Sequence, residues 1–262
     1  MLRGLYTSAL GMTTQMQRMD VVSNNLANVN TTSFKRDSVA AQAFSDRLGL
    51  RLNDPAVTGI IRLMGSTGPV GALGQGVFID EVFTDFETGG IHETGSPLDL
   101  AIIDNGFFAL TVTNQDGTQQ EQFSRAGAFT LSSDGTLIDM MGAIVQNQGG
   151  APINVPVGTI TIDQAGQIFV NEEYVDTIRI VNFENLESLR KTRGSYWTTT
   201  EESQMIDFTG TVQQGFLENS NVSPVREMVE LIALSRAYEA NSRLVQLHDE
   251  TLGRAVNEIA RR

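Results

Sequence analysis

The 262-residue sequence contains no cysteine, only two histidines and no run of 18 consecutive apolar residues. The missing cysteines exclude disulfides, thiolate metal sites, iron–sulfur clusters and cysteine nucleophiles. His92 and His248 are too few for a three-histidine metal site. Without a long apolar run we expect no transmembrane helix and no insertion into a membrane. The sequence thus indicates no metal and no other cofactor.

Positive charge is also scarce. The sequence has 18 Lys and Arg residues but 31 Asp and Glu residues, which gives a net charge of −13. This balance argues against binding nucleic acid or an anionic membrane through a basic surface. Residues 1–36 carry +3 and residues 224–262 are neutral, so the remaining −16 lies between them. Glycine is divided in the same way, with 21 of 25 glycines between Gly59 and Gly215. The composition predicts two helical ends around a glycine-rich middle.

The N-terminal segment has an apolar pattern that alternates between spacings of three and four, which is typical of a coiled-coil seam. Its positions are Leu2, Leu5, Ala9, Met12, Met16, Met19, Ser23 and Leu26. The asparagine-rich residues 24–30 predict the end of this helix, because asparagine tolerates the left-handed conformation of a C-cap. The same asparagines are also candidates for contacts between subunits.

A second seam runs through the C-terminal segment, at Leu231, Leu234, Tyr238, Asn241, Val245, His248, Leu252, Ala255 and Ile259. Ser223 and Pro224 predict an N-cap followed by the first helical residue. A helix of about 36 residues would be roughly 54 Å long. Met228, Val229 and Ile232 widen the apolar stripe. The stripes either pack only within the chain or pair and leave a face for another subunit; their width and their place at opposite chain ends favour the second interpretation.

The middle of the chain predicts short antiparallel strands between Gly and Asp-Gly turns, which is typical of a β-sandwich or barrel. The candidate strands are residues 98–112 with a break at 104–106, a strand ending near Phe123, and residues 129–131, 137–138, 160–162, 167–170 and 174–183. Residues 49–76 are expected to form an extended connector with one short strand.

The expected fold is α+β, with long terminal helices pairing as a coiled coil and a central, mostly antiparallel β-domain. The expected divisions are a helix with its asparagine-rich cap at 1–36, an extended connector at 37–90, the β-domain at 91–205, a return connector at 206–223 and a second helix at 224–262.

Few residues are candidates for chemistry. Asp99 and Asp104 would form a carboxylate pair for acid–base work on a sugar, but in a chain with 31 acidic residues such proximity is common. Residues 71–76 are glycine-rich, yet they lack the lysine and the helix start that phosphate binding needs. The Asp-Gly pairs lack the run of acids of a calcium loop. We therefore expect no enzymatic activity; the rival hypotheses are a glycan hydrolase and a soluble oligomeric binding module with a coiled-coil stalk.

Three stretches resemble the signatures of the flagellar rod and hook proteins, in the order in which that family carries them. The first stretch is MDVVSNNLANVNTTSFKR at residues 19–36. The second comprises TGSPLDLAI at 94–102, GFF at 106–108 and FSRAGAF at 123–129. The third comprises VQQGFLENSNV at 212–222 and RAYEANS at 236–242. Together they extend over most of the chain.

The resemblance implies a structural subunit of the bacterial flagellar basal-body rod, located outside the cytoplasmic membrane and exported by the flagellar type III apparatus without a cleaved signal peptide. Such proteins polymerise into a helical tube that transmits torque to the hook. The implied partners are further copies of the chain, other rod and hook proteins, the export apparatus and, where an outer membrane exists, bushing-ring proteins. The asparagine-rich segment and the ending Phe34-Lys35-Arg36 favour the distal over the proximal type of rod protein.

In this interpretation both helices supply the self-assembly contacts, and both ends should become ordered on assembly because their stripes lack partners in the free chain. The candidate interface residues are Leu5, Met12, Met16, Met19, Asn24, Asn25, Leu26, Asn28, Leu231, Leu234, Tyr238, Asn241, Val245, Leu252 and Ile259.

Overall fold

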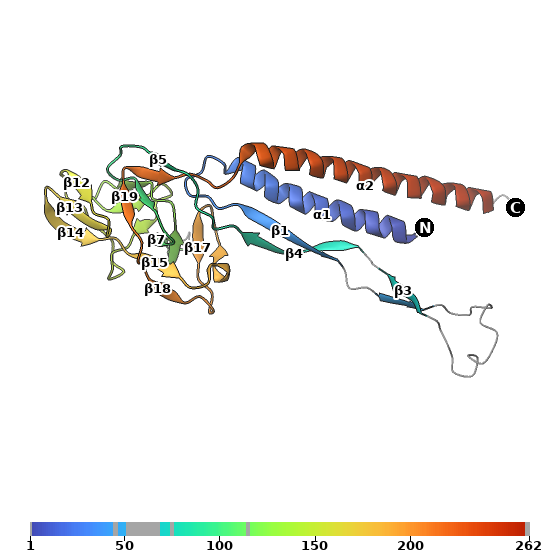
Figure 1. The fold of residues 1–262 in the computed structure, drawn as a ribbon, viewed down its shortest axis with the longest axis horizontal. Helices are drawn as coiled ribbons and strands as arrows, with labels where there is room; N and C mark the ends of the chain where they lie inside the picture. The colour runs from blue at the N-terminus through green and yellow to red at the C-terminus, as the bar shows by residue number, and fades with distance from the viewer. Residues whose placement is uncertain (1, 44–46, 51–68, 74–75, 114–115, 260–262) are drawn as a thin grey trace, which may run out of the picture. The chain divides into compact units, whose positions relative to one another are not determined.

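The computed structural model describes residues 2–43, 47–50, 69–73, 76–113 and 116–259 (Figure 1). The chain divides into two compact units. Unit 1 comprises Met1–Asn24, Ser38–Phe83 and Val225–Arg262, and unit 2 comprises Asn25–Asp37 and Thr84–Pro224. Both chain ends are helical and the middle is mostly antiparallel β-structure, so the predicted α+β class is confirmed.

The two long helices are α1 (Leu2–Ala27) and α2 (Pro224–Ile259), and nearly all of each lies in unit 1. The end of α1 at Ala27 agrees with the stop signal predicted in the asparagine-rich stretch. The start of α2 at Pro224 confirms the predicted first helical residue, where the missing N–H of proline is no loss. Glu227 lies in the first turn of α2, where the helix dipole favours a carboxylate.

Within unit 1, α1 and α2 lie side by side and antiparallel (Figure 1). A Cβ atom added at Gly4 would collide with the ring of His248, and one added at Gly11 would lie 3.0 Å from the Nδ2 atom of Asn241. Ser8 is buried and lies on the same face of α1 as the two glycines. Small residues of α1 therefore make this contact, and the Leu and Met seam predicted for α1 is offset by one residue, which is about 100° around the helix.

Unit 1 also contains two pairs of strands that lie between the helices in the sequence. Strand β1 (Asp37–Ala43) pairs with β4 (Val77–Thr84), and β2 (Arg47–Leu50) pairs antiparallel with β3 (Pro69–Leu73). The Thr14 hydroxyl donates to the carbonyl oxygens of Leu10 at 2.9 Å and Val77 at 3.0 Å, which links α1 to β4. The predicted connector at 49–76 falls largely on residues 51–68, which lie outside the described part of the chain.

Unit 2 is built from short strands and one 3₁₀ turn. These are β5 (Ile91–Glu93), β6 (Leu100–Ile102), β7 (Phe107–Thr113), β8 (Gln119–Ser124), β9 (Phe129–Leu131), β10 (Leu137–Asp139), β11 (Ile144–Val145), β12 (Ile160–Ile162), β13 (Gln167–Val170), β14 (Glu173–Thr177), β15 (Ile180–Phe183), η2 (Leu186–Ser188), β16 (Arg190–Lys191), β17 (Tyr196–Thr198), β18 (Met205–Asp207), β19 (Val212–Gln214) and β20 (Phe216–Glu218).

Nine of these strands form one sheet in the order β16-β17-β8-β7-β11-β10-β9, with β15 joining β7 to β18. The others pair as β12-β13-β14, β19-β6 and β20-β5. The candidate strand at 174–183 is in fact two strands. The first, β14, pairs with β13 as far as Thr177, and the second, β15, pairs with β7 from Ile180. The remaining predicted strands of the middle are confirmed within a few residues.

The core of unit 2 has two apolar clusters on opposite faces of β7. Because neighbouring side chains of a strand point to opposite faces, Phe107 and Phe108 fill different clusters. Phe108 packs edge-on against Phe129 with ring centroids 5.0 Å apart. Phe107 packs in the same manner against Phe183 at 5.7 Å. Trp197, the only tryptophan, is buried in the second cluster.

Phe108→Ala should lower the free energy of unfolding of unit 2 by about 3–5 kcal/mol, because it removes a fully buried ring and leaves a cavity. Urea unfolding of the full chain, followed by the fluorescence of buried Trp197, measures this loss. Thr130→Ala, at an exposed position of β9, is the control and should change stability by less than about 0.5 kcal/mol. Equal losses in the two variants would contradict the proposed core.

Candidate functional site

Three buried charges of unit 2 meet in a group that we call the Glu218 cluster, formed by Lys35, Arg125 and Glu218. Lys35 Nζ donates to Glu218 Oε1 at 2.7 Å, and Arg125 Nε donates to Glu218 Oε2 at 2.6 Å. The three side chains are only 1–3% exposed. Burial lowers the pKa of Lys35 and the charge of Glu218 opposes that shift. Each residue comes from a different signature stretch, so all three signatures converge on this cluster.

Further hydrogen bonds tie the same segments together. The backbone N–H of Ser33 donates to the carbonyl oxygen of Glu218 at 2.9 Å. Asn221 accepts the N–H of Arg36 at 2.7 Å and donates to the carbonyl of Asp85 at 2.9 Å. These bonds join chain segments more than 130 residues apart, and they satisfy backbone N–H and C=O groups of those segments. The convergence is thus a structural junction inside unit 2.

Lys191 contacts the same junction through residues that follow α1. Its ammonium lies 3.9 Å from the centroid of the Phe34 ring and donates to Asp37 Oδ2 at 2.9 Å. Burial lowers the pKa of Lys191, and the bond to Asp37 opposes the shift. The side chain of Asn25 binds the backbone of Asp37 twice, donating from Nδ2 at 2.8 Å and accepting at Oδ1 at 3.0 Å. The amide of Asn25, a predicted interface residue, is therefore engaged within unit 2.

The predicted interface residues differ in how far their side chains are exposed to solvent. In α1, Met16 is 49% exposed and Leu5, Met12 and Met19 are half-buried. Leu26 and Asn28 are half-buried and Asn24 is exposed. In α2, Leu234 is buried, and the half-buried residues are Leu231, Tyr238, Asn241, Val245 and Leu252. The side chain of Ile259 lies outside the described part of the structure.

Other large apolar side chains of unit 1 are exposed although the heptad pattern does not contain them. They are Tyr6, Val77, Val82, Phe83, Val225, Met228, Val229, Ile232, Leu244, Leu247 and Val256. The sequence signals Met228, Val229 and Ile232 as a widening of the stripe. Leu244, Leu247 and Val256 were missed because they fall between the heptad positions, and the β4 residues because no strand was predicted there. Exposed apolar groups of this extent are typical of a surface that packs against other molecules.

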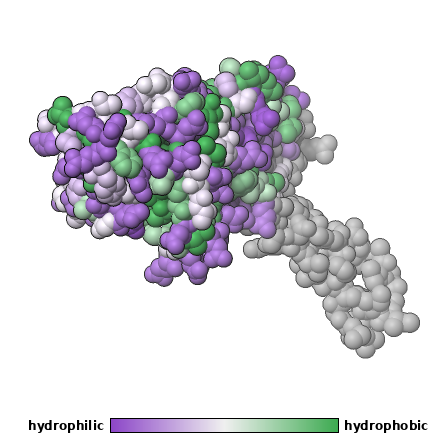
Figure 2. All heavy atoms as spheres, turned by 60° about the vertical axis from the view of Figure 1, so that its left-hand side comes forward, coloured by the Kyte–Doolittle hydropathy of each residue, from purple (hydrophilic) through white to green (hydrophobic). Residues whose placement is uncertain are grey.

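The two units differ sharply in charge. Unit 2 holds 7 Lys and Arg residues against 20 Asp and Glu residues, whereas unit 1 holds 11 of each. The face of the β-domain displayed in Figure 2 is mostly hydrophilic, with scattered apolar side chains. Unit 1 thus combines neutrality with exposed apolar groups, and unit 2 carries the whole net charge of the protein.

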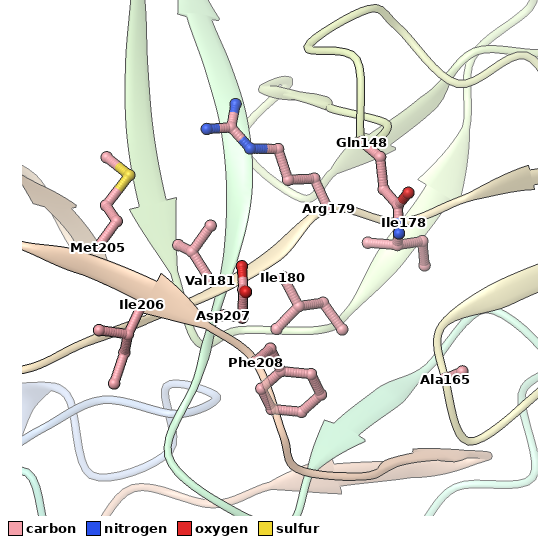
Figure 3. Close-up of a pocket in the computed structure, with 10 residues that line it drawn as sticks. All are labelled: Gln148, Ala165, Ile178, Arg179, Ile180, Val181, Met205, Ile206, Asp207 and Phe208. Atoms are coloured by element: carbon pink, nitrogen blue, oxygen red, sulfur yellow. The ribbon is translucent and has the colours of Figure 1, made fainter.

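The remaining candidates for chemistry have structural partners. The Asp99 carboxylate accepts the Thr94 hydroxyl at 2.6 Å, and Asp104 is exposed in the loop after β6. Figure 3 shows a hollow beside β15 and β18 that is lined mainly by apolar side chains. Its one cation, Arg179, donates to Glu121 at 2.6 Å and to Gln146 at 3.0 Å. Among the described residues no group of three or more His, Asp or Glu side chains is placed to hold a metal ion, and no described helix is long and apolar enough to cross a membrane.

Three family models match successive parts of the chain. The model for flagella basal body rod protein matches residues 5–35. The model for flagellar hook protein FlgE/F/G D1 domain matches residues 101–170. The model for flagellar basal body rod FlgEFG protein C-terminal matches residues 213–258. Their order agrees with the three signature stretches of the sequence.

Relatives match over almost the full chain. The flagellar basal-body rod protein FlgG of Bacillus subtilis (strain 168) is 32% identical over 98% of this chain and 99% of its own length. FlgG of Borreliella burgdorferi is 33% identical over 98% of each chain. The flagellar basal-body rod protein FlgF of Caulobacter vibrioides is 29% identical, also over 98% of each chain.

Glu218→Gln should lower the free energy of unfolding of unit 2 by about 3–5 kcal/mol, because Lys35 and Arg125 would remain buried without a counter-charge. The measurement is urea unfolding of the full chain with Trp197 fluorescence as the signal. Glu121→Gln makes the same chemical change at the partly exposed pair with Arg179 and should remove no more than about 1 kcal/mol. A loss at Glu218 as small as that at Glu121 would show that the cluster does not stabilise the unit.

Proposed function

Because this chain belongs to the family of flagellar basal-body rod proteins, we propose that it polymerises with further copies of itself into the rod, the shaft that transmits torque to the hook. The observation that carries the proposal is the surface of unit 1, where both terminal helices and β4 expose large apolar side chains on a neutral unit. Apolar groups of this kind are buried when copies of a chain pack together.

The small-residue contact between the helices supports this role. Gly4 and Gly11 of α1 meet His248 and Asn241 of α2, so these contacts lie beside the Leu and Met stripe of α1 and not on it. Met16 remains exposed as a result. An open helical polymer requires two different surfaces on each subunit, and wide apolar stripes on two helices supply them. Pairing of α1 and α2 as a coiled coil is part of the proposal.

We propose the distal position in the rod, since FlgG proteins of Bacillus subtilis and Borreliella burgdorferi are 32% and 33% identical to the chain and the FlgF protein of Caulobacter vibrioides is 29% identical. The neighbours would be other rod and hook proteins, together with bushing-ring proteins where an outer membrane exists. Export through the flagellar apparatus without a cleaved signal peptide and the absence of catalytic activity complete the proposal. The soluble binding module with a coiled-coil stalk is the alternative.

Ile232→Glu should abolish motility and leave the purified subunit folded, because Ile232 is exposed on α2 and would be buried only on assembly. Swimming through soft agar and the circular dichroism of the purified chain are the two measurements. Glu239→Gln, at an exposed polar position of α2, is the matched control and should leave motility unchanged. Normal motility of Ile232→Glu would remove this part of α2 from the assembly surface.

Cross-linking mass spectrometry of purified basal bodies tests the position of the subunit. We expect cross-links from this chain to itself and to the hook or its junction, because the distal rod ends there. Cross-links to the inner-membrane ring would instead assign the proximal rod. A chain missing from intact basal bodies, but recovered as a stable soluble oligomer, would support the binding module.

A further inference from the structure

Two exposed features of unit 2 are left without a role by the junction and by the helices. The first, which we call the methionine corner, consists of Met140 and Met141 in the β10–β11 turn together with Arg193. The second, which we call the acidic hairpin, consists of Glu172, Glu173 and Tyr174 at the β13–β14 turn. Figure 1 shows β14, which carries Glu173 and Tyr174, and β17, which follows Arg193 in the sequence, at opposite sides of the β-domain.

The methionine corner is held rigidly. The Asp139 side chain accepts the N–H of Met141 at 2.6 Å through Oδ1 and the hydroxyl of Tyr196 at 2.6 Å through Oδ2. Burial raises the pKa of Tyr196, and the hydrogen bond to Asp139 raises it further, so the hydroxyl keeps its proton. Met140 is 79% exposed and Met141 is 57% exposed on this fixed turn. Two flexible apolar side chains on a rigid base are suited to contact another surface.

A hollow beside the methionine corner is lined by a cation and by a buried glutamine. Met141, Arg193, Tyr196 and Gln122 line it. Gln122 is only 6% exposed, and its Oε1 atom has no hydrogen-bond partner within the described residues. This oxygen is itself buried, so the hollow offers a docking segment mainly the positive charge of Arg193. The hollow therefore fits a segment that carries negative charge.

The acidic hairpin presents such groups on an equally rigid turn. Val170 pairs with Glu173 and closes a tight turn in which Asn171 and Glu172 have positive φ angles of 52° and 68°. The side chain of Asn171 accepts the N–H of Thr159 at 3.1 Å, which fixes the tip. Tyr174 is 54% exposed and its ring packs on Phe169. The tip thus offers two carboxylates and an aromatic ring, whose hydroxyl is already hydrogen-bonded to the Thr177 hydroxyl at 2.9 Å.

We infer that the acidic hairpin of one copy of this chain docks on the methionine corner of the next copy, with Glu172 facing Arg193 and Tyr174 contacting the methionines. The inference rests on the proposed polymerisation. Because the two features differ and lie on opposite sides of the domain, the contact is head-to-tail and repeats along a filament. Unit 2 domains with 20 acidic and 7 basic residues repel one another, and a cation placed against an acidic tip offsets this repulsion.

The natural absence of cysteine permits a direct test in the full chain. A strain whose only copy carries both Arg193→Cys and Glu172→Cys is expected to give basal bodies in which a bifunctional maleimide, long enough to span the gap left by a paired Arg and Glu, links the chain into a ladder of dimers, trimers and higher multiples. Either substitution alone should give no ladder. Asn105→Cys with Glu172→Cys, which moves the first cysteine to an exposed loop, is the matched control and should also give none.

The possible results separate the two proposals. If the unsubstituted chain is found in basal bodies and the double cysteine variant assembles without a ladder, the docking is wrong and the rod subunit stands. If the unsubstituted chain is missing from basal bodies, the rod proposal itself falls. An adduct with a protein of another mass would show that a different subunit occupies the corner, which also overturns the inference.

A charge exchange provides a second readout should the cysteine variants fail to assemble. Arg193→Glu alone and Glu172→Arg alone are each expected to reduce swimming, since each places like charges together. The double exchange should restore swimming, because the ion pair is reformed in reverse. Full motility of both single variants, or equal loss in all three, would overturn the inference.

Discussion

The carboxylate of Glu218 is the one group on which unit 2 most depends, because it neutralises two cations that are almost fully removed from water. Lys35 and Arg125 would each be costly to bury alone, and Glu218 contacts both at less than 3 Å. The three residues are far apart in the sequence, so their meeting fixes the segment that follows α1 against the strand that precedes α2. Asn221, Lys191 and Asn25 add hydrogen bonds around that junction, so every signature stretch of the chain has a partner there.

Because charge is divided unevenly between the units, the two units differ in how they interact with other molecules. Unit 1 is neutral and exposes apolar side chains, so the contacts with other copies that we propose would be favoured by removal of apolar surface from water. Unit 2 is acidic, and a net charge of this kind makes copies of the unit repel one another and opposes non-specific association. In this acidic surface, a fixed turn presents two exposed methionines next to an arginine, and the hairpin at the other side of the domain presents carboxylates.

Helix packing inside unit 1 depends on small residues. A Cβ at Gly4 or Gly11 would meet the side chains of His248 or Asn241, so the ring and the amide of α2 fit against α1 because these positions are glycine. The Leu and Met stripe of α1 is turned away by about 100° from this contact. A chain in which the apolar stripe filled the intramolecular contact would have little left for a neighbour. The glycines therefore connect the fold of the subunit to the assembly that we propose.

The sequence by itself determined the elements that depend on local patterns. Heptad spacing and the Ser-Pro start specified both helices, and Gly and Asp-Gly turns specified most strands of the middle, because these signals act over a few residues. Only the tertiary structure decided which face of α1 meets α2, since two glycines carry no apolar signal in a sequence. It also decided that β1 pairs with β4 and that Lys35, Arg125 and Glu218 meet. Such contacts depend on which distant segments the fold brings together, and a single sequence contains no local record of them.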